Sequence, residues 1–500
     1  MEKTVMLISH THWDREWYKT LQEFRLELVK MMDGLLELLL QDPEFKFFHL
    51  DGQTAIVDDY LDLRPEKKET IIELIKSGRL RIGPWYLQPD NFIVSGEGLI
   101  RNLLKGTMYA KSMGENKCVG WLPDSFGHPS QLPQILTNFG IESFIFSRGL
   151  GNHLSKEAIE FIWESPHKDP VIAIFQNGGY YSGSNLAYPF FWGDIRTLEP
   201  NHTLAVTKLQ NLIKNSEKSS FSDVIPIWNG SDHMAPERKL PETIQYANTH
   251  ISDYQIVHGS AEEYVRTVKK NITSLQTISG ELRGGKYEAI LASVLSSRMH
   301  IKQTNYSLER ALERETEPLM VFADLLGHAY PKYALDDAWK ALLRNHFHDT
   351  ICGCSIDQVH NEMNWNFTKT EQTVNSLSYD GLNYIASVLT PGKTGNNYNN
   401  SVNLFLFNGI PQYRKDVVYT KVDVPYWEGE CRSFVYGNEI EVPVQILKSE
   451  TINDLWVPAE ARADHIIKNI HWWQEYLRYI EKEVLSLSVL ILVQTTRLLY

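Results

Sequence analysis

The feature that most constrains the fold is the alternation of short apolar runs with helical patterns over roughly the first 280 residues. An apolar run at residues 4–9 is followed by a long amphipathic pattern at 21–40, and a second helical pattern covers 67–78. Further strand-like runs lie at 47–50, 81–83, 117–122, 143–147, 171–175, 224–228 and 254–258. Such alternation predicts a parallel sheet, open or closed into a barrel, with its chemistry at the carboxyl ends of the strands. We expect an α/β fold in which residues 1–280 form a parallel β/α barrel-like catalytic domain.

The pattern changes to long helices after about residue 300. Residues 306–326, 335–346 and 358–389 have the length and spacing of a three-helix bundle, so we assign 281–390 to a helical bundle. A polar linker at 390–401 precedes strand-like segments, of which 404–407 and 441–444 are the clearest. We expect a partial β-domain at 400–455, the start of a β-sandwich. Residues 456–500 form an atypical tail of helix and apolar run, as expected of a truncated or frame-shifted end.

The composition narrows the partners and the compartment. Hydrophobic residues make up 43% and charged residues 22% of the 500 residues, as in ordinary globular proteins. The net charge is −13 and no long Lys/Arg cluster occurs, so we expect no nucleic-acid partner. The most apolar stretch, 484–493, is shorter than the ~20 residues that span a bilayer, so we expect no membrane partner. The N-terminus becomes polar too soon for a secretory signal, and four cysteines are too few for a disulfide framework. We expect a cytoplasmic protein, and a homo-oligomer is compatible with the sequence.

A dense group of ionisable side chains directly follows the first predicted strand, in the order His10-Thr11-His12-Trp13-Asp14-Arg15-Glu16-Trp17. Charged groups this close to a core must be paired or bound to a metal. In extended chain, His12 and Asp14 point to the same side, and one nitrogen with one oxygen ligand suits zinc. The alternative is a surface loop in which the charges pair with one another.

Two further carboxylates follow predicted strands. Asp124 lies in the segment Pro123-Asp124-Ser125-Phe126-Gly127-His128, and Asp232 lies in Asn229-Gly230-Ser231-Asp232-His233. Each has a structural alternative, because aspartate commonly shapes turns. Both nevertheless fall at strand ends on one face of the domain, and glycoside hydrolysis needs two carboxyl groups flanking one bond.

The fourth segment is Asn345-His346-Phe347-His348-Asp349-Thr350-Ile351-Cys352-Gly353-Cys354. Helical spacing groups His346 with Leu335, Trp339 and Leu342, which indicates a core histidine. His348 falls outside that stripe and is free to face the first domain. A single Cys-x-Cys without a second pair is a weak metal signal, so we expect small packed thiols at Cys352 and Cys354.

These four segments together resemble glycoside hydrolase family 38, the retaining, metal-dependent α-mannosidases, from about residue 5 to 450. Asp51-Gly52-Gln53 and Gly83-Pro84-Trp85-Tyr86 are most similar to bacterial members, which include a mannosylglycerate hydrolase. The resemblance implies one zinc ion per chain. Its ligands would be His12, Asp14, Asp124 and His348.

The resemblance also implies roles for the other segments. Asp124 would be the nucleophile as well as a ligand, and Asp232 the general acid/base. Arg148 corresponds to an arginine that holds the free oxygen of the nucleophile. Substrate-contacting residues would be Trp17, Phe126 and Asp349. The expected substrate is a mannose-containing oligosaccharide or a small mannoside, hydrolysed through a covalent glycosyl-enzyme intermediate.

Two alternatives remain open from the sequence. Family members are usually much longer, so the chain could be an inactive truncated relic that binds only zinc or sugar. His10-x-His12 after a first strand also suits a metal-dependent amidohydrolase or carbohydrate deacetylase. That second alternative needs further strand-end histidines and a bridging lysine, and the sequence does not identify such a lysine.

Overall fold

The computed structural model describes residues 3–154, 158–189, 198–270, 275–389 and 406–409, together with the backbone of five strands between 415 and 494. The chain divides into two compact units. The first unit comprises residues 1–313 and 332–375, and the second comprises 314–331 and 376–500. All the sequence-predicted site residues belong to the first unit.

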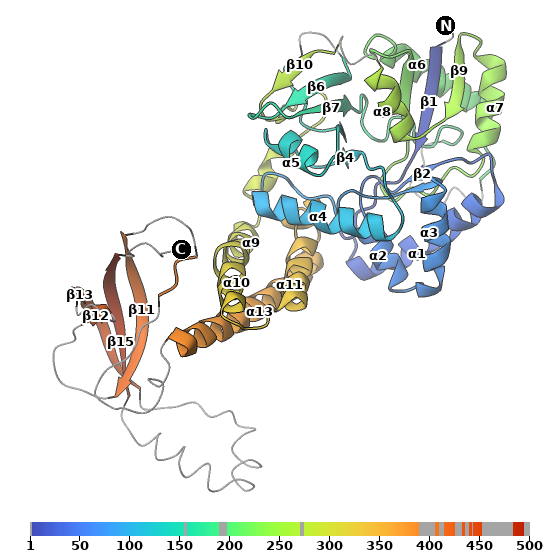
Figure 1. Ribbon diagram of the computed structural model, residues 1–500. Helices are drawn as coiled ribbons and strands as arrows, with labels where there is room; N and C mark the ends of the chain where they lie inside the picture. Colours follow the sequence, from blue (N-terminus) through green and yellow to red (C-terminus); the bar gives the residue numbers. More distant parts are fainter. Residues whose placement is uncertain are drawn as a thin grey trace. The chain divides into compact units, whose positions relative to one another are not determined.

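The N-terminal strand is the centre of a three-stranded parallel sheet in the first unit. Strand β1 (Lys3–Ser9) lies between β8 (Val224–Asn229) and β9 (Tyr254–His258), and helices α7 (Leu240–His250) and α8 (Ala261–Lys269) pack beside this sheet (Figure 1). Val5 and Leu7 join the apolar core formed with helix α1 (Leu21–Gln41), while Met6 and Ile8 face the opposite way. A strand buried on both faces is typical of a parallel sheet covered on each side.

A second sheet of the first unit has five strands in the order β10-β6-β7-β5-β4. Their bounds are β4 (Gly120–Leu122), β5 (Ser143–Phe146), β6 (Glu160–Glu164), β7 (Pro170–Phe175) and β10 (Thr277–Ser279). All neighbouring pairs are parallel except β6 and β7, which run antiparallel. Trp121, Ile145 and Ile174 of this sheet share one buried apolar cluster with β1, so the two sheets meet in a common core.

Helices surround these sheets and begin at recognisable caps. Thr20 and Ser260 each form a capping box with the glutamate three residues later, which satisfies free backbone N–H groups at the helix start. The helices up to residue 269 are α1 (Leu21–Gln41), α2 (Ala55–Leu61), α3 (Lys68–Lys76), α4 (Gly96–Ser112), α5 (Leu132–Asn138), α6 (His202–Ser216), α7 (Leu240–His250) and α8 (Ala261–Lys269). A short parallel pair, β2 (Phe48–His49) and β3 (Leu80–Arg81), completes this region.

The predicted α/β alternation agrees with these elements to within a few residues at each bound. Strands β6 and β10 and helices α2, α4, α5, α6, α7 and α8 were not among the predicted elements. The hydrogen-bonded strands of the described chain form separate sheets of three, five and two strands in this region, and closure into a barrel stays a prediction.

The helices expected to form a bundle are distributed over both units. In the first unit, α11 (Lys332–Arg344) packs against α4 and against α9 (Met299–Ala311), and α12 (His348–Ile351) follows it. A π-helical turn at Leu312–Thr316 joins α9 to α10 (Glu317–Leu325). Helix α13 (Asp357–Leu389) continues from the first unit into the second at residue 376.

The second unit has a small apolar cluster in which Leu319, Met320 and Ala323 of α10 meet Ile385 of α13. Its described strands are β11 (Lys415–Pro425), β12 (Ser433–Val435), β13 (Ile440–Val442), β14 (Val444–Ile452) and β15 (Val484–Gln494). Strand β15 pairs antiparallel with both β11 and β14, so the apolar run of the expected tail is a strand of this sheet. Residues 456–483 and 495–500 of that tail lie outside the described residues.

The expected strand at 404–407 is only partly described. Residues 404 and 405 lie outside the described residues, and Leu406 and Phe407 are in irregular chain rather than in a strand. The β-sandwich itself stays a prediction. Across the described helices, none combines the length and apolar character needed to cross a bilayer.

Candidate metal centre and active site

The register of β1 and β8 brings His12 next to Asp232. Ser9 of β1 is paired with Asn229 of β8, and each chain continues for three residues to His12 and Asp232, which form a further parallel bridge. The backbone N–H of His12 donates to the Ser231 carbonyl (3.1 Å), and the N–H of His233 donates to the His12 carbonyl (2.7 Å). Two residues beyond His12, the buried carboxylate of Asp14 lies with its Oδ1 3.0 Å from His12 Nε2.

The register of β4 and β5 similarly aligns Asp124 with Arg148. Leu122 is paired with Phe146, and both site residues come two positions later on these neighbouring parallel strands. Arg148 donates its Nε–H to Asp124 Oδ1 at 2.6 Å. The guanidinium also donates to the Ala289 carbonyl at 2.5 Å, so two hydrogen bonds fix the orientation of the Arg148 guanidinium. One oxygen of Asp124 is thereby held, and the other is left for a second partner.

His348 supplies that second partner from the beginning of helix α12. Its Nε2 lies 3.3 Å from Asp124 Oδ2 and 3.5 Å from Asp14 Oδ1. The Gln88 carbonyl accepts hydrogen bonds from both the backbone N–H (2.9 Å) and the ring Nδ1 (3.2 Å) of His348. This orientation leaves Nε2 of the ring directed at the two aspartates. His348 is therefore adjacent to Asp14 and Asp124, although about 200 residues of chain separate it from the nearer one in sequence.

The resulting cluster fits a metal ion by the state of its buried polar atoms. His12 Nε2, Asp14 Oδ1 and His348 Nε2 are all buried without a hydrogen-bond partner in the described part of the chain. One ligand atom each from His12, Asp124 and His348 lies within 4.8 Å of the others. Unpartnered buried polar atoms are costly, and a shared cation would satisfy them together. Two imidazole nitrogens and two carboxylate oxygens form a donor set that suits zinc.

The charges of the cluster also favour a bound cation. Burial opposes protonation of both histidines, yet Asp14 and Asp51 raise the pKa of His12 well above its ordinary value. Asp349 and Asp124 likewise raise the pKa of His348 to about 9 against the effect of burial. Burial favours the neutral form of Asp124, but Arg148 and His348 together lower the pKa of this carboxyl. The field of the carboxylates thus attracts positive charge, which a bound cation would supply with both histidines neutral.

Asp232 has a different environment from Asp124. The Tyr180 hydroxyl donates to Asp232 Oδ1 at 2.7 Å. Burial, and then the negative charge of Asp14, raise the pKa of Asp232 to about 6. The pKa of Asp124 is therefore lowered while the pKa of Asp232 is raised, which is the difference expected between a nucleophile and an acid.

The expected substrate-contacting residues lie at different places around this cluster. Phe126 is buried, with its ring 5.7 Å from that of His348 and perpendicular to it. Asp349 Oδ2 lies 3.6 Å from His348 Nε2. Trp17 is only partly buried, and its ring makes a T-shaped contact with the ring of Tyr18. The Tyr18 hydroxyl lies 3.4 Å from His233 Nδ1. His346 is buried and hydrogen-bonded to Asn305 (2.8 Å), as expected of a core histidine.

Sequence reasoning missed three residues that hold the cluster: Asp51, Gln88 and Tyr180. Asp51 Oδ2 accepts from His12 Nδ1 at 2.5 Å and is fully buried. The Gln88 amide donates to the Asp51 carbonyl at 2.8 Å, so one network orients both histidines. Asp51 follows a predicted strand, and that position was the available signal. His10, by contrast, contacts the Tyr180 carbonyl through Nε2 (2.8 Å), and no candidate metal group among the described residues includes it.

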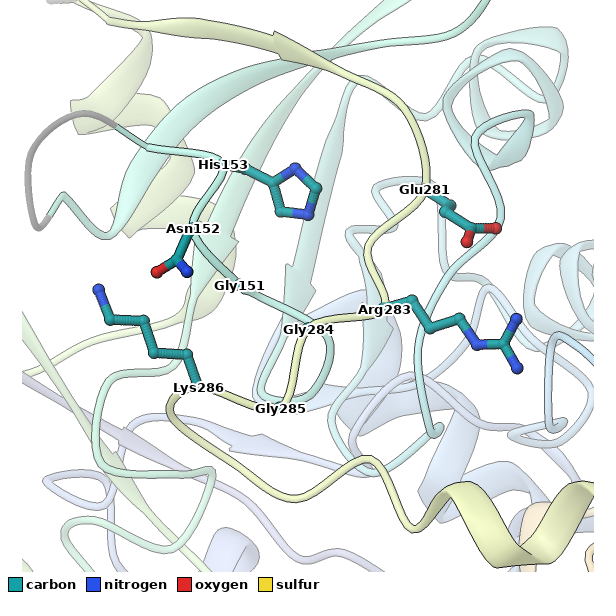
Figure 2. A pocket seen from close by; sticks show the side chains of 8 residues that line it. All are labelled: Gly151, Asn152, His153, Glu281, Arg283, Gly284, Gly285 and Lys286. Carbon is teal, nitrogen blue, oxygen red and sulfur yellow. The ribbon is translucent and has the colours of Figure 1, made fainter.

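A hollow of about 480 Å³ lies between residues 151–153, which follow β5, and residues 281–286, which follow β10 (Figure 2). Its lining residues are Gly151, Asn152, His153, Glu281, Arg283, Gly284, Gly285 and Lys286. Two segments of the chain pass close to each other here. A Cβ on Gly284 would lie 2.2 Å from Gly151 Cα, so only glycine fits at this position. The segment that forms this wall continues to Glu288, which accepts from the Tyr181 hydroxyl (3.2 Å), and to Ala289, which contacts Arg148. One segment of chain therefore lines the hollow and contacts Arg148, the residue that holds Asp124.

Comparison with known protein families gives two matches. Residues 2–281 match the family described as "Glycosyl hydrolases family 38 N-terminal domain". Residues 290–385 match the "Alpha mannosidase middle domain". The first match alone covers more than half of the chain.

Individual relatives agree with these matches. The chain is 36% identical over 388 residues to a protein of Halalkalibacterium halodurans described as "Putative mannosylglycerate hydrolase", with coverage of 74% of this chain and 41% of that protein. It is 23% identical over 425 residues to human alpha-mannosidase 2C1, covering 83% of this chain and 37% of the relative. The crystal structure of an alpha-mannosidase from Enterococcus faecalis V583 is similar with a TM-score of 0.79 and 28% identity, covering 99% of this chain and 55% of that one. The chain thus spans about two fifths of the length of the curated relatives it matches.

Proposed function

The chain belongs to family 38 of the glycosyl hydrolases, and we propose that it is a retaining, zinc-dependent α-mannosidase that hydrolyses terminal α-mannosides. The observation that carries the proposal is the convergence of His12, Asp14, Asp124 and His348 on one point, with Arg148 on the nucleophile. These four residues would hold one zinc ion. When bound, zinc acts as a Lewis acid toward the cis 2- and 3-hydroxyls of mannose, a pair that glucose lacks.

Catalysis by this chain's residues follows the two-step scheme of retaining glycosidases. In the first step, an Asp124 oxygen attacks the anomeric carbon and forms a covalent ester with the sugar, while Arg148 holds the other oxygen. Asp232 donates its proton to the departing glycosidic oxygen, so the leaving group departs as an alcohol. In the second step, Asp232 takes a proton from water, the water oxygen attacks the same carbon, and the ester to Asp124 breaks. Retention calls for carboxyls about 5–5.5 Å apart.

The environments of the two carboxyls support these roles. A nucleophile must be ionised, and the pKa of Asp124 is lowered by Arg148 and His348 against the effect of burial. An acid must begin protonated, and burial together with Asp14 raises the pKa of Asp232 to about 6. Around them we assign Phe126, Trp17 and Asp349 to contacts with the sugar, Asp349 through its hydroxyls.

The wider assignments follow from the same proposal. We assign 1–280 to a barrel-like catalytic domain, 281–390 to a helical bundle and 400–455 to a partial β-sandwich, to which β15 of the 456–500 tail adds a strand. The substrate is a mannose-containing oligosaccharide or small mannoside. Free thiols at Cys118, Cys352 and Cys354 support a reducing cytoplasm.

The decisive experiment separates the nucleophile from the acid. Purified chain should release mannose as the α-anomer first from an activated aryl α-mannoside, lose activity on chelation and regain it with zinc. Asp124→Ala should abolish turnover and weaken zinc binding together, because one residue has both roles. Asp232→Ala should keep its zinc, and its rate should fall more for poor leaving groups than for good ones.

Three results would contradict the proposal. Activity that survives exhaustive chelation would show that the metal is not needed for the reaction. Loss of zinc in Asp232→Ala, with zinc retained in Asp124→Ala, would show that Asp232 rather than Asp124 is the zinc ligand. A folded, zinc-loaded chain that turns over no α-mannoside would support the inactive relic instead. Release of acetate or ammonia from an amide substrate would support the deacetylase or amidohydrolase alternative.

A further inference from the structure

We propose that Cys352, Cys354 and Asp349 form a second cation site, for a thiophilic divalent ion, which shares Asp349 with the candidate active site. One ligand atom from each of these residues lies within 4.8 Å of the other two. The Cys-x-Cys pair alone is a weak signal in sequence. The added observation is the carboxylate that the fold places beside both sulfurs.

Local chain geometry brings the three ligands together. Asp349 and Cys352 lie three residues apart at α12, which puts them on one helical face. Gly353 then adopts a positive φ of 85°, and the chain turns back so that Cys354 Sγ lies 3.1 Å from Asp349 Oδ1. Cys352 is buried while Cys354 is exposed, so the site has a closed floor and an opening to solvent. A cation from solution can therefore reach it without rearrangement of the core.

The donor set defines the class of ion. Two sulfurs with one oxygen favour soft d¹⁰ ions such as zinc in excess or cadmium, whereas magnesium and calcium require oxygen ligands throughout. Binding forms two metal–sulfur bonds and one metal–oxygen bond, and the two thiol protons are released to the buffer. No electron is transferred. Lys302 Nζ donates to the Cys352 carbonyl at 2.8 Å, which anchors the backbone of this ligand.

Sharing of Asp349 couples this site to catalysis, and this part rests on the proposed function. Asp349 Oδ1 faces Cys354, while Oδ2 lies 3.6 Å from His348 Nε2 in the metal centre. A cation held by the thiols would fix the Asp349 carboxylate and withdraw it from the hydroxyls of the sugar. The second ion is therefore an inhibitor at concentrations above those that fill the first site.

Cadmium titration of the full-length, zinc-loaded protein tests the proposal. Cadmium–thiolate bonds give an ultraviolet charge-transfer absorption, and the first centre has no thiol ligand, so this band reports only on a thiol site. We expect the band to grow to saturation at one cadmium per chain while bound metal rises from one ion to two. The double variant C352S/C354S should show no band and bind one ion. The matched variant C118S/C431S, which removes the other two cysteines, should keep the band.

Inhibition is measured in the same titration, with each protein's activity normalised to its own rate before cadmium is added. Activity should fall as the band grows in wild type and in C118S/C431S, and this fall should be absent in C352S/C354S. Wild-type protein that binds a single ion and shows no band would overturn the site. So would a band that persists in C352S/C354S. If the band is present but the chain has no mannosidase activity, the proposed function fails while the second site stands, because absorption and stoichiometry need no substrate.

Discussion

The Tyr180 hydroxyl is the direct partner of the proposed acid, Asp232, at 2.7 Å. A hydrogen bond donated to a carboxylate stabilises its ionised form, so this contact holds the pKa of Asp232 below the value that burial and Asp14 alone would set. The acid works only when protonated. With a pKa of about 6, its proton is lost, and kcat/KM falls, as the pH rises through that value.

Tyr180→Phe should move this basic limb of the pH profile to higher pH, because the ionised carboxylate loses a donor. The measurement is kcat/KM against pH on an aryl α-mannoside. Tyr181→Phe is the matched control: its hydroxyl pairs with Glu288 (3.2 Å) rather than with Asp232, so its limb should stay in place. A downward movement in Tyr180→Phe, or equal movement in both variants, would contradict the assignment.

A strand end together with a dense motif pointed to His12, Asp14 and Asp124, and the structure places these side chains close together. It missed Tyr180 and Gln88, because their partners are fixed by contacts between distant segments rather than by spacing along the chain. The grouping of those predicted residues follows from strand register, and the roles assigned to them stay proposals.

Among the elements, helix α4 packs so closely on the preceding segment that one of its positions accepts only glycine. A Cβ on Gly106 would lie 2.1–2.2 Å from backbone atoms of Pro84, Trp85 and Tyr86. Tyr86 is two residues before Gln88, whose carbonyl holds His348. The contact between helix and segment therefore supports one wall of the metal centre.

Gly106→Ala should lower the free energy of unfolding by about 1–3 kcal/mol or more, since the new methyl group can be accommodated only by moving backbone. Denaturant unfolding measures this loss, and zinc affinity should fall with it because Gln88 is displaced. Gly96→Ala, in the same helix, is the control: nothing lies within 4 Å of its Cβ position, and its stability should change little. Equal stability of the two variants would show that the segment around Pro84, Trp85 and Tyr86 can move to accommodate the methyl group at little cost.

Helix α4 also shows why some elements escaped prediction. Three of its residues, Gly96, Gly98 and Gly106, are poor helix formers, and this obscures the local signal. Its helical state depends on packing against residues far from it in sequence. Strand β6 pairs antiparallel with β7, whereas strand–helix alternation predicts neighbours that run parallel.

At the scale of the whole molecule, the proposed metal centre joins chain segments that are remote in sequence. Its proposed ligands follow the ends of β1 and β4 or begin α12, all within the first unit. A zinc ion that binds only the folded chain stabilises it by mass action, by about 2.7 kcal/mol at roughly 100 times the dissociation constant.

Zinc should therefore raise the melting temperature of the metal-free protein, and a chelator should reverse the increase. Thermal unfolding at several zinc concentrations measures the effect. His348→Ala should lose the zinc dependence, while Asp232→Asn should retain it because Asp232 is not assigned as a ligand. A zinc-dependent shift that persists in His348→Ala would place the ion elsewhere.

Domain-scale organisation was the part least accessible to sequence. The change from strand–helix alternation to long helices marks residue 300 correctly as a change of element type. The grouping of 314–331 with 376–500 depends on packing such as that of Met320 against Ile385, which no local pattern encodes.

The alignment of Asp124 with Arg148 is inherited from the pairing of Leu122 with Phe146 two positions earlier. Successive side chains on a strand point to opposite faces, so losing a single amino acid from either strand would turn the aspartate or the arginine toward the wrong side. During evolution of this fold, the loops that follow can become longer or shorter with little penalty. The number of residues between the paired strand positions and the carboxylate must stay the same.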